Sequence, residues 1–202
     1  MQETAVEAWT EGAHLPGDSL RALFDLNQRF LELVTLAQGW RHHLGLAPAL
    51  SASVAALSPP NRAALAACPY GLFDVRFGDD SYWRERLAGA WQWRVADQPD
   101  RSEAREFTGL CLFYAWHVAA RSVEQSQLQL GMGSETAAAF RRVKLNDLTL
   151  LADQESDHLC ARWHQYPSFW EALIGAAAGA DRRALKRTQL YGLQLTAAAR
   201  LP

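Results

Sequence analysis

The chain of 202 residues shows the same order of helix breakers and apolar runs twice, at a separation of 86 residues. A period of this length excludes a solenoid array, whose units recur about every 20 to 50 residues. The pattern predicts two copies of one small unit, over residues 18–95 and 102–178, followed by a C-terminal helix over residues 181–202. The matched landmarks are Leu44–Gly45 with Leu130–Gly131, Ala52 with Ala138, Leu57 with Val143, Leu65–Ala66 with Leu151–Ala152, and Arg76–Phe77 with Arg162–Trp163.

Helical periodicity dominates both copies, so we predict an all-α fold. Ser58–Pro59 is typical of a helix start, because the serine side chain can cap a first turn and proline fits its first position. One long helix is predicted from Glu103 to about Gln127. Short extended segments are expected near residues 72–77, where apolar and polar residues nearly alternate, and near residues 159–163.

Each copy is too small to bury a sufficient core alone. We therefore expect the two copies to pack about an approximate two-fold axis, as the subunits of a homodimer do. The extended segments around Arg76 and Arg162 are expected to pair across this axis. The chain would then form a pseudo-dimer by itself, and whether it assembles into a further homo-oligomer is left open.

Composition narrows the class of protein. The formal net charge is -2 from 20 basic and 22 acidic residues, so no overall field draws the chain to nucleic acid or to an anionic membrane. The most apolar stretches, residues 109–120 and 172–180, are too short to span a bilayer. The first twelve residues carry three glutamates and no basic residue, unlike a secretory signal. With three widely spaced cysteines, a cytoplasmic protein is expected.

The sequence offers no complete catalytic or metal-binding pattern. Glu155 and His158 have the spacing found in di-iron bundles, but the further glutamates of such a site are not evident. No nucleophile elbow of the form GxSxG occurs, and the Gly-x-Gly at residues 131–133 is interpreted as the stop of one helix and the start of the next. We therefore expect no catalytic residues, no metal and no cofactor, and we predict that the protein is not an enzyme.

Two groups of residues are candidates for contacts with partners. The chain has eight tryptophans, a residue type that is enriched at protein interfaces. The candidate partner-binding residues among them are Trp83, Trp91 and Trp170. Most of the tryptophans are expected in the core.

The second group lies in the C-terminal helix. Residues 181–202 sum to +4, whereas residues 1–100 sum to -4, and the basic residues could contact a phosphate or an acidic partner. The alternative interpretation is a solvated helix face. Direct DNA binding by the chain alone is expected to be weak or absent. The candidate contact residues are Arg182, Arg183, Lys186 and Arg187.

The repeated unit resembles the flagellar transcriptional activator FlhD. The resemblance rests on a long first helix that contains FDLNQRFLELVTLAQ and on the later segments of the unit, and it covers about residues 20–88 and again about 107–170. The matching segments are Leu44–Gly45, Leu130–Met132, Ala56–Ser58, Leu65–Ala66, Leu151–Ala152, LFDVRFGDD at residues 72–80 and HLCARW at residues 158–163.

Members of that family are small all-helical bacterial proteins that dimerise and activate transcription together with a zinc-bearing partner subunit, which makes most of the DNA contacts. The resemblance therefore implies a non-enzymatic regulatory subunit that acts through a protein partner. This chain differs from the family in its duplication and in its additional C-terminal helix. The alternative hypothesis is a helical protein that binds or converts a small molecule in a pocket between the two units.

Overall fold

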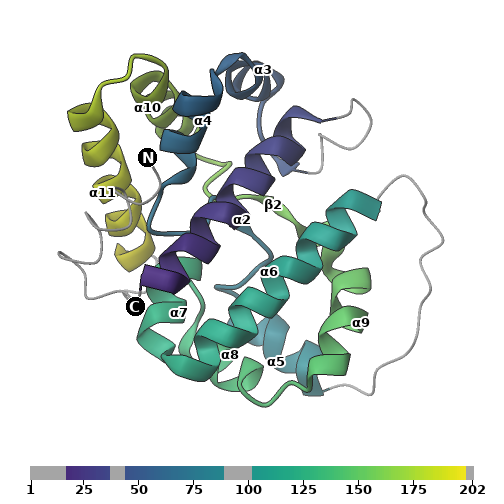
Figure 1. Cartoon of the computed structure of the whole chain (residues 1–202). Helices are drawn as coiled ribbons and strands as arrows, with labels where there is room; N and C mark the ends of the chain where they lie inside the picture. Colours follow the sequence, from purple (N-terminus) through teal and green to yellow (C-terminus); the bar gives the residue numbers. More distant parts are fainter. Residues whose placement is uncertain (1–16, 37–43, 89–101, 199–202) are drawn as a thin grey trace.

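The computed structural model describes residues 17–36, 44–88 and 102–198. Within these residues the protein is all-α, as predicted, with one sheet of two very short strands (Figure 1). Trp91 and the predicted boundary between the two units lie outside the described residues. No helix in the described ranges is long and apolar enough to cross a membrane.

The described elements follow the same order in both halves of the chain. Adding 86 to the bounds of α2, α3, α4 and α5 gives ranges that overlap α6, α8, α9 and α10 respectively. The first half contains α2 (Gly17–Thr35), α3 (Pro48–Ala56), α4 (Pro59–Ala66), β1 (Phe73–Asp74) and α5 (Asp80–Ala88). The second half contains α6 (Ser102–Arg121), α7 (Val123–Leu130), α8 (Ser134–Phe140), α9 (Leu145–Glu155), the 3-10 turn η3 (Ser156–His158), β2 (Cys160–Ala161), α10 (Pro167–Ala178) and α11 (Arg182–Ala198).

Local sequence signals explain where several helices begin and end. The Ser58 side chain accepts a hydrogen bond from the Asn61 backbone amide and so caps α4, as predicted. The prediction of one helix over residues 103–127 is wrong, because Ser122 leaves the helical conformation and caps a separate helix, α7, through the Gln125 amide. Gly131 ends α7 in the left-handed conformation that glycine tolerates best.

The two predicted extended segments form the two strands. Phe73 pairs with Ala161 and Asp74 pairs with Cys160 in an antiparallel arrangement. Asp74 and Cys160 are 86 residues apart, so the strand pair joins positions that correspond in the two halves.

Helices α2 and α6 lie side by side at the centre of the molecule (Figure 1). The rings of Phe30 and Phe107 lie there with their centroids 5.8 Å apart, and Phe73 from β1 packs edge-on against Phe107 at 5.3 Å. All three side chains are fully buried. One core therefore extends through both halves.

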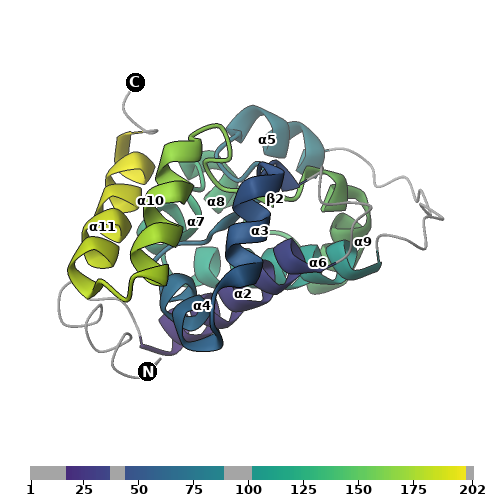
Figure 2. The ribbon, with the colours of Figure 1, turned by 90° about the horizontal axis from the view of Figure 1, so that it is seen from above.

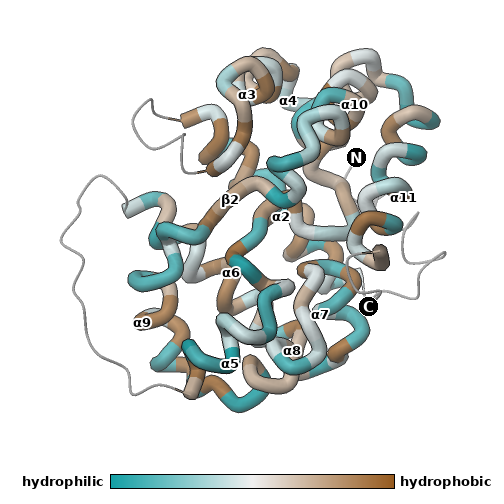
Figure 3. The backbone as a smooth tube through the Cα atoms, turned by 180° about the vertical axis from the view of Figure 1, so that it is seen from behind, coloured by the Kyte–Doolittle hydropathy of each residue, from teal (hydrophilic) through white to brown (hydrophobic). Residues whose placement is uncertain are grey.

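Helices α5 and α10 overlap at the offset of 86 residues, and each packs on the opposite half. Helix α5 contacts α8, and α10 contacts α3 and α4, so the two contacts are reciprocal (Figures 1 and 2). Helix α11 lies outside this arrangement and packs on α10 and α7. Hydrophobic and hydrophilic stretches alternate along the helices, as expected where each helix buries one face (Figure 3).

Candidate ligand site at the junction of the halves

A cavity of about 470 Å³ lies where the two halves and α11 meet. We call it the junction cavity. Its wall comes from the segment after β1, from the turn between α7 and α8, from the residues after β2 and from the end of α11. Its lining includes Asp74, Gly78, Gly131, Arg162, Gln165 and Thr196.

Arg162 provides the cation of the junction cavity. Arg162 is only 7% exposed to solvent. The guanidinium donates from Nη1 to the Gln129 carbonyl at 3.1 Å and from Nη2 to Thr196 Oγ1 at 3.3 Å, and its Cζ lies 4.7 Å from the centre of the Trp163 ring. These contacts hold a positive charge in place in the wall of the cavity.

Two carboxylates line the same cavity. Asp74 Oδ1 accepts a hydrogen bond from the Phe77 amide at 3.1 Å. Burial raises the pKa of Asp74, although the nearby Arg162 charge and the backbone hydrogen bonds lower it in part. The second carboxylate, Asp80, accepts from the backbone amide and the hydroxyl of Thr136 at 2.8 and 2.7 Å. The cavity thus combines charges of both signs.

Glycines bring the backbone close to these charged groups. At Gly131, with φ of 68°, a Cβ atom would collide with the guanidinium of Arg162. At Gly133, it would collide with the Asp80 carboxylate. The Gly-x-Gly segment therefore ends one helix and precedes the next, as predicted, and it also leaves room for the charged side chains of the cavity.

A second polar cluster connects α5 to α9. Glu155 is fully buried. It accepts hydrogen bonds from the Tyr82 hydroxyl at 2.5 Å and from Arg86 Nε at 2.6 Å. Arg76 lies over the Tyr82 ring at 4.6 Å, and His158 contacts the same ring edge-on. Burial, followed by the bond to Glu155, raises the pKa of Tyr82. We call this group the Glu155 cluster.

Two of the candidate partner-binding tryptophans are part of the core. Trp83 and Trp170 are both fully buried. Their indole N–H groups donate to the carbonyls of Arg76 and Arg162 at 3.0 and 2.9 Å. A partner contact through these side chains stays a prediction, and it would require α5 or α10 to move.

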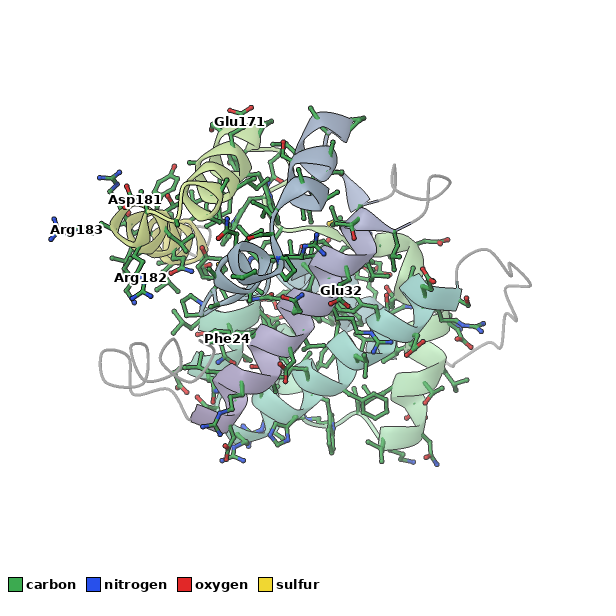
Figure 4. The ribbon with its side chains drawn as sticks, turned by 45° about the horizontal axis from the view of Figure 1, so that its top comes forward. Phe24, Glu32, Glu171, Asp181, Arg182 and Arg183 are labelled. Carbon is green, nitrogen blue, oxygen red and sulfur yellow. The ribbon has the colours of Figure 1, made fainter. Side chains whose placement is uncertain are left out.

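The candidate basic residues lie on α11, outside the junction cavity. Arg182, Arg183 and Arg187 are exposed, and Arg182 and Arg183 point away from the molecule (Figure 4). Partial burial lowers the pKa of Lys186. Asp181 caps the helix by accepting hydrogen bonds from two backbone amides of its first turn. The structure therefore separates the basic surface of α11 from the charged groups of the cavity.

Sequence reasoning placed Arg162 at a landmark of the repeat but did not identify it as a site residue, and it missed Asp74. One signal could have identified both residues: Asp74 and Arg162 carry opposite charges and lie in the two extended segments that were expected to pair. Among the described residues, no group of three or more His, Cys, Asp or Glu side chains could hold a metal ion.

Comparisons with protein families, with curated proteins and with solved structures find nothing that matches the chain. The fold and the site define the class of protein: an all-α protein in which α5 packs on the second half, α10 packs on the first half, and a polar cavity lies where the halves meet.

Proposed function

We propose that the chain is a tandem fusion of two FlhD-like units and acts as a non-enzymatic regulatory subunit through a protein partner. The observation that carries the proposal is the reciprocal packing of α5 on α8 and of α10 on α3 and α4. Such an exchange of terminal elements is a common way for two identical units to build a dimer. The pairing of Asp74 with Cys160 supports the same relation, because these positions are 86 residues apart.

The exposed basic residues of α11 are the surface that we assign to the partner. Arg182, Arg183 and Arg187 extend into solvent from one end of a helix that has no counterpart among the described elements of the first half. An acidic protein surface would complement this charge. The cytoplasm is the compartment that we propose for this interaction.

The test starts from the protein in its native cells. A tagged chain should co-purify with one stoichiometric protein, and the purified pair should re-form a complex of defined mass. The double variant Arg183→Glu with Arg187→Glu should weaken that complex about tenfold or more, chiefly through slower association. The matched control, Arg141→Glu with Arg142→Glu, changes the same charge at two exposed residues beyond the end of α8.

Three results would contradict this proposal. The first is a chain that elutes alone from native extract. The second is catalytic turnover by the isolated chain. The third is strong DNA binding by the chain alone that weakens steeply with salt and disappears when the four basic residues of α11 are neutralised, which would indicate a direct DNA-binding protein.

Small-molecule binding is the second candidate function, and the junction cavity is the observation that favours it. A cavity of about 470 Å³ with a few charged groups directed into it is typical of a ligand site. Binding there does not conflict with a role as a regulatory subunit, because a ligand could control the same protein.

A further inference from the structure

The two halves differ at one pair of positions beside the junction cavity. Gly78 and His164 are 86 residues apart. A Cβ atom at Gly45 would lie 2.8 Å from the His164 ring, so an imidazole fills the space beside Gly45. Beside the corresponding Gly131 stands Gly78, which has no side chain, and the guanidinium of Arg162 occupies the Cβ direction of Gly131 instead. Both glycines line the cavity. The junction cavity therefore lacks, at position 78, the imidazole that position 164 places beside Gly45.

The charges around the junction cavity indicate what could enter it. A guanidinium binds a carboxylate through parallel hydrogen bonds, and carboxylates bind an ammonium group. Arg162 and Asp74 both line the cavity, and they are close enough for the Arg162 charge to lower the pKa of Asp74 against the effect of burial. The bond from Arg162 to Thr196 is long, at 3.3 Å, so a ligand carboxylate could take its place with a stronger, charge-assisted bond.

We propose that the junction cavity binds a free α-amino acid, with its carboxylate on Arg162 and its ammonium group on Asp74. This inference rests on the second candidate function and names its ligand class. An amino acid fits within about 470 Å³ and leaves room for its side chain beside Gln165 and Thr196. Thr196 belongs to α11, so the bound ligand would connect this helix to the strand pair.

The experiment is isothermal titration calorimetry of the full chain with each of the twenty L-amino acids. At least one should bind at a single site with a Kd of about 1 mM or tighter. Two analogues of the amino acid that binds serve as controls: the amine that lacks its carboxylate and the acid that lacks its amino group. Each should bind about tenfold more weakly or worse, because each lacks one charge-assisted hydrogen bond. Inorganic phosphate serves as the probe for simple anion binding.

Gly78→His is the decisive variant, because it places in the cavity the side chain that the other half carries at position 164. The variant should keep its circular dichroism spectrum and lose amino acid binding. A Cβ atom at Gly78 makes only an ordinary contact, 3.4 Å from the Gly131 carbonyl, so the backbone accepts this change. The control is Gly175→Ala, where an added Cβ meets no atom within 4 Å and binding should be unchanged.

The outcomes distinguish a wrong ligand class from the absence of any ligand site in the junction cavity. Amino acid binding that survives Gly78→His would overturn the proposal. If only phosphate, only the amine or only the acid binds, and Gly78→His abolishes that binding, the amino acid assignment is wrong while the cavity remains a ligand site. If no probe binds up to about 10 mM, far above the Kd expected here, both the ligand class and the second candidate function fail.

Discussion

Helices α5 and α10 occupy corresponding places in the two halves, but different forces hold them. Helix α10 buries a row of large apolar side chains, whereas α5 buries only Trp83 and relies on polar contacts. The buried residues of α10 are Phe169, Trp170, Leu173, Ile174, Ala176 and Ala177. The polar contacts of α5 are those of Asp80 with Thr136, Arg84 with Glu135, and Tyr82 and Arg86 with Glu155.

Two helices in corresponding places can therefore differ in how easily each one detaches from the rest of the fold. Apolar burial is non-directional, and many contacts share its free energy. A buried hydrogen-bonded ion pair is directional, and the loss of one partner leaves the other charge buried without compensation. A single substitution should therefore release α5, while α10 should leave its place only when the whole fold unfolds.

The largest expected effect comes from Trp170→Ala, which removes the central apolar contact of α10. The loss of a fully buried indole should lower the free energy of unfolding by about 3–5 kcal/mol. Urea denaturation followed by circular dichroism measures this change. A loss of less than about 1 kcal/mol would contradict the central role that we assign to this side chain.

Glu155→Ala should have the next largest effect, and it should be local to α5. The variant removes the buried carboxylate that accepts from Tyr82 and pairs with Arg86. Because the Arg86 side chain is 33% exposed and keeps its hydrogen bond to Gln154, the cost should be about 2 kcal/mol. Native-state hydrogen exchange should show the amides of α5 exchanging faster while those of α10 keep their protection. Glu155→Gln is the matched control for shape, since it keeps an acceptor for the Tyr82 hydroxyl. Equal loss of protection in both helices would refute the proposed difference between them.

Asp74→Asn tests the charge at the strand pair that joins the halves. The pKa of Asp74 is raised by burial, so its favourable contribution to stability is present in full below its unfolded value of 3.8. That contribution is lost as the pH rises through the raised pKa. Asparagine keeps an acceptor for the Phe77 amide and does not ionise. Denaturation across pH 4 to pH 8 should show the variant gaining stability relative to the natural protein as the pH rises.

Arg84→Ala should have the smallest effect. The side chains of Arg84 and Glu135 are 63% and 60% exposed, so water screens the ion pair between them. The expected loss is about 0.5 kcal/mol or less. The same denaturation assay measures it, and a loss as large as that of Glu155→Ala would show that the surface pair, rather than the buried cluster, holds α5.

The arrangement of helices was largely predictable from the sequence, because breakers and periodicity are local signals. Ser58–Pro59 and the alternation at residues 72–77 both led to correct elements. The break at Ser122 was missed, since apolar residues continue on both sides of it. One serine in the extended conformation was enough to divide the helix.

The candidate site was harder to predict, because it depends on contacts between distant segments. Charged residues are rarely buried, so no local signal predicted that Arg162 lies inside the molecule. The tryptophans show the opposite problem. Most of them were expected in the core, but their number does not tell which ones are buried, and the two candidates Trp83 and Trp170 fill the core with their N–H groups satisfied.

The pairing of Asp74 with Cys160 has a consequence for how such a molecule can evolve. In a dimer of identical subunits, a residue on the symmetry axis must face its own copy, so an aspartate there would meet a second aspartate, and like charges directly opposite each other are destabilising. A single chain is free of that restriction. It can keep a carboxylate on one side and a thiol on the other, and every later mutation changes one side alone.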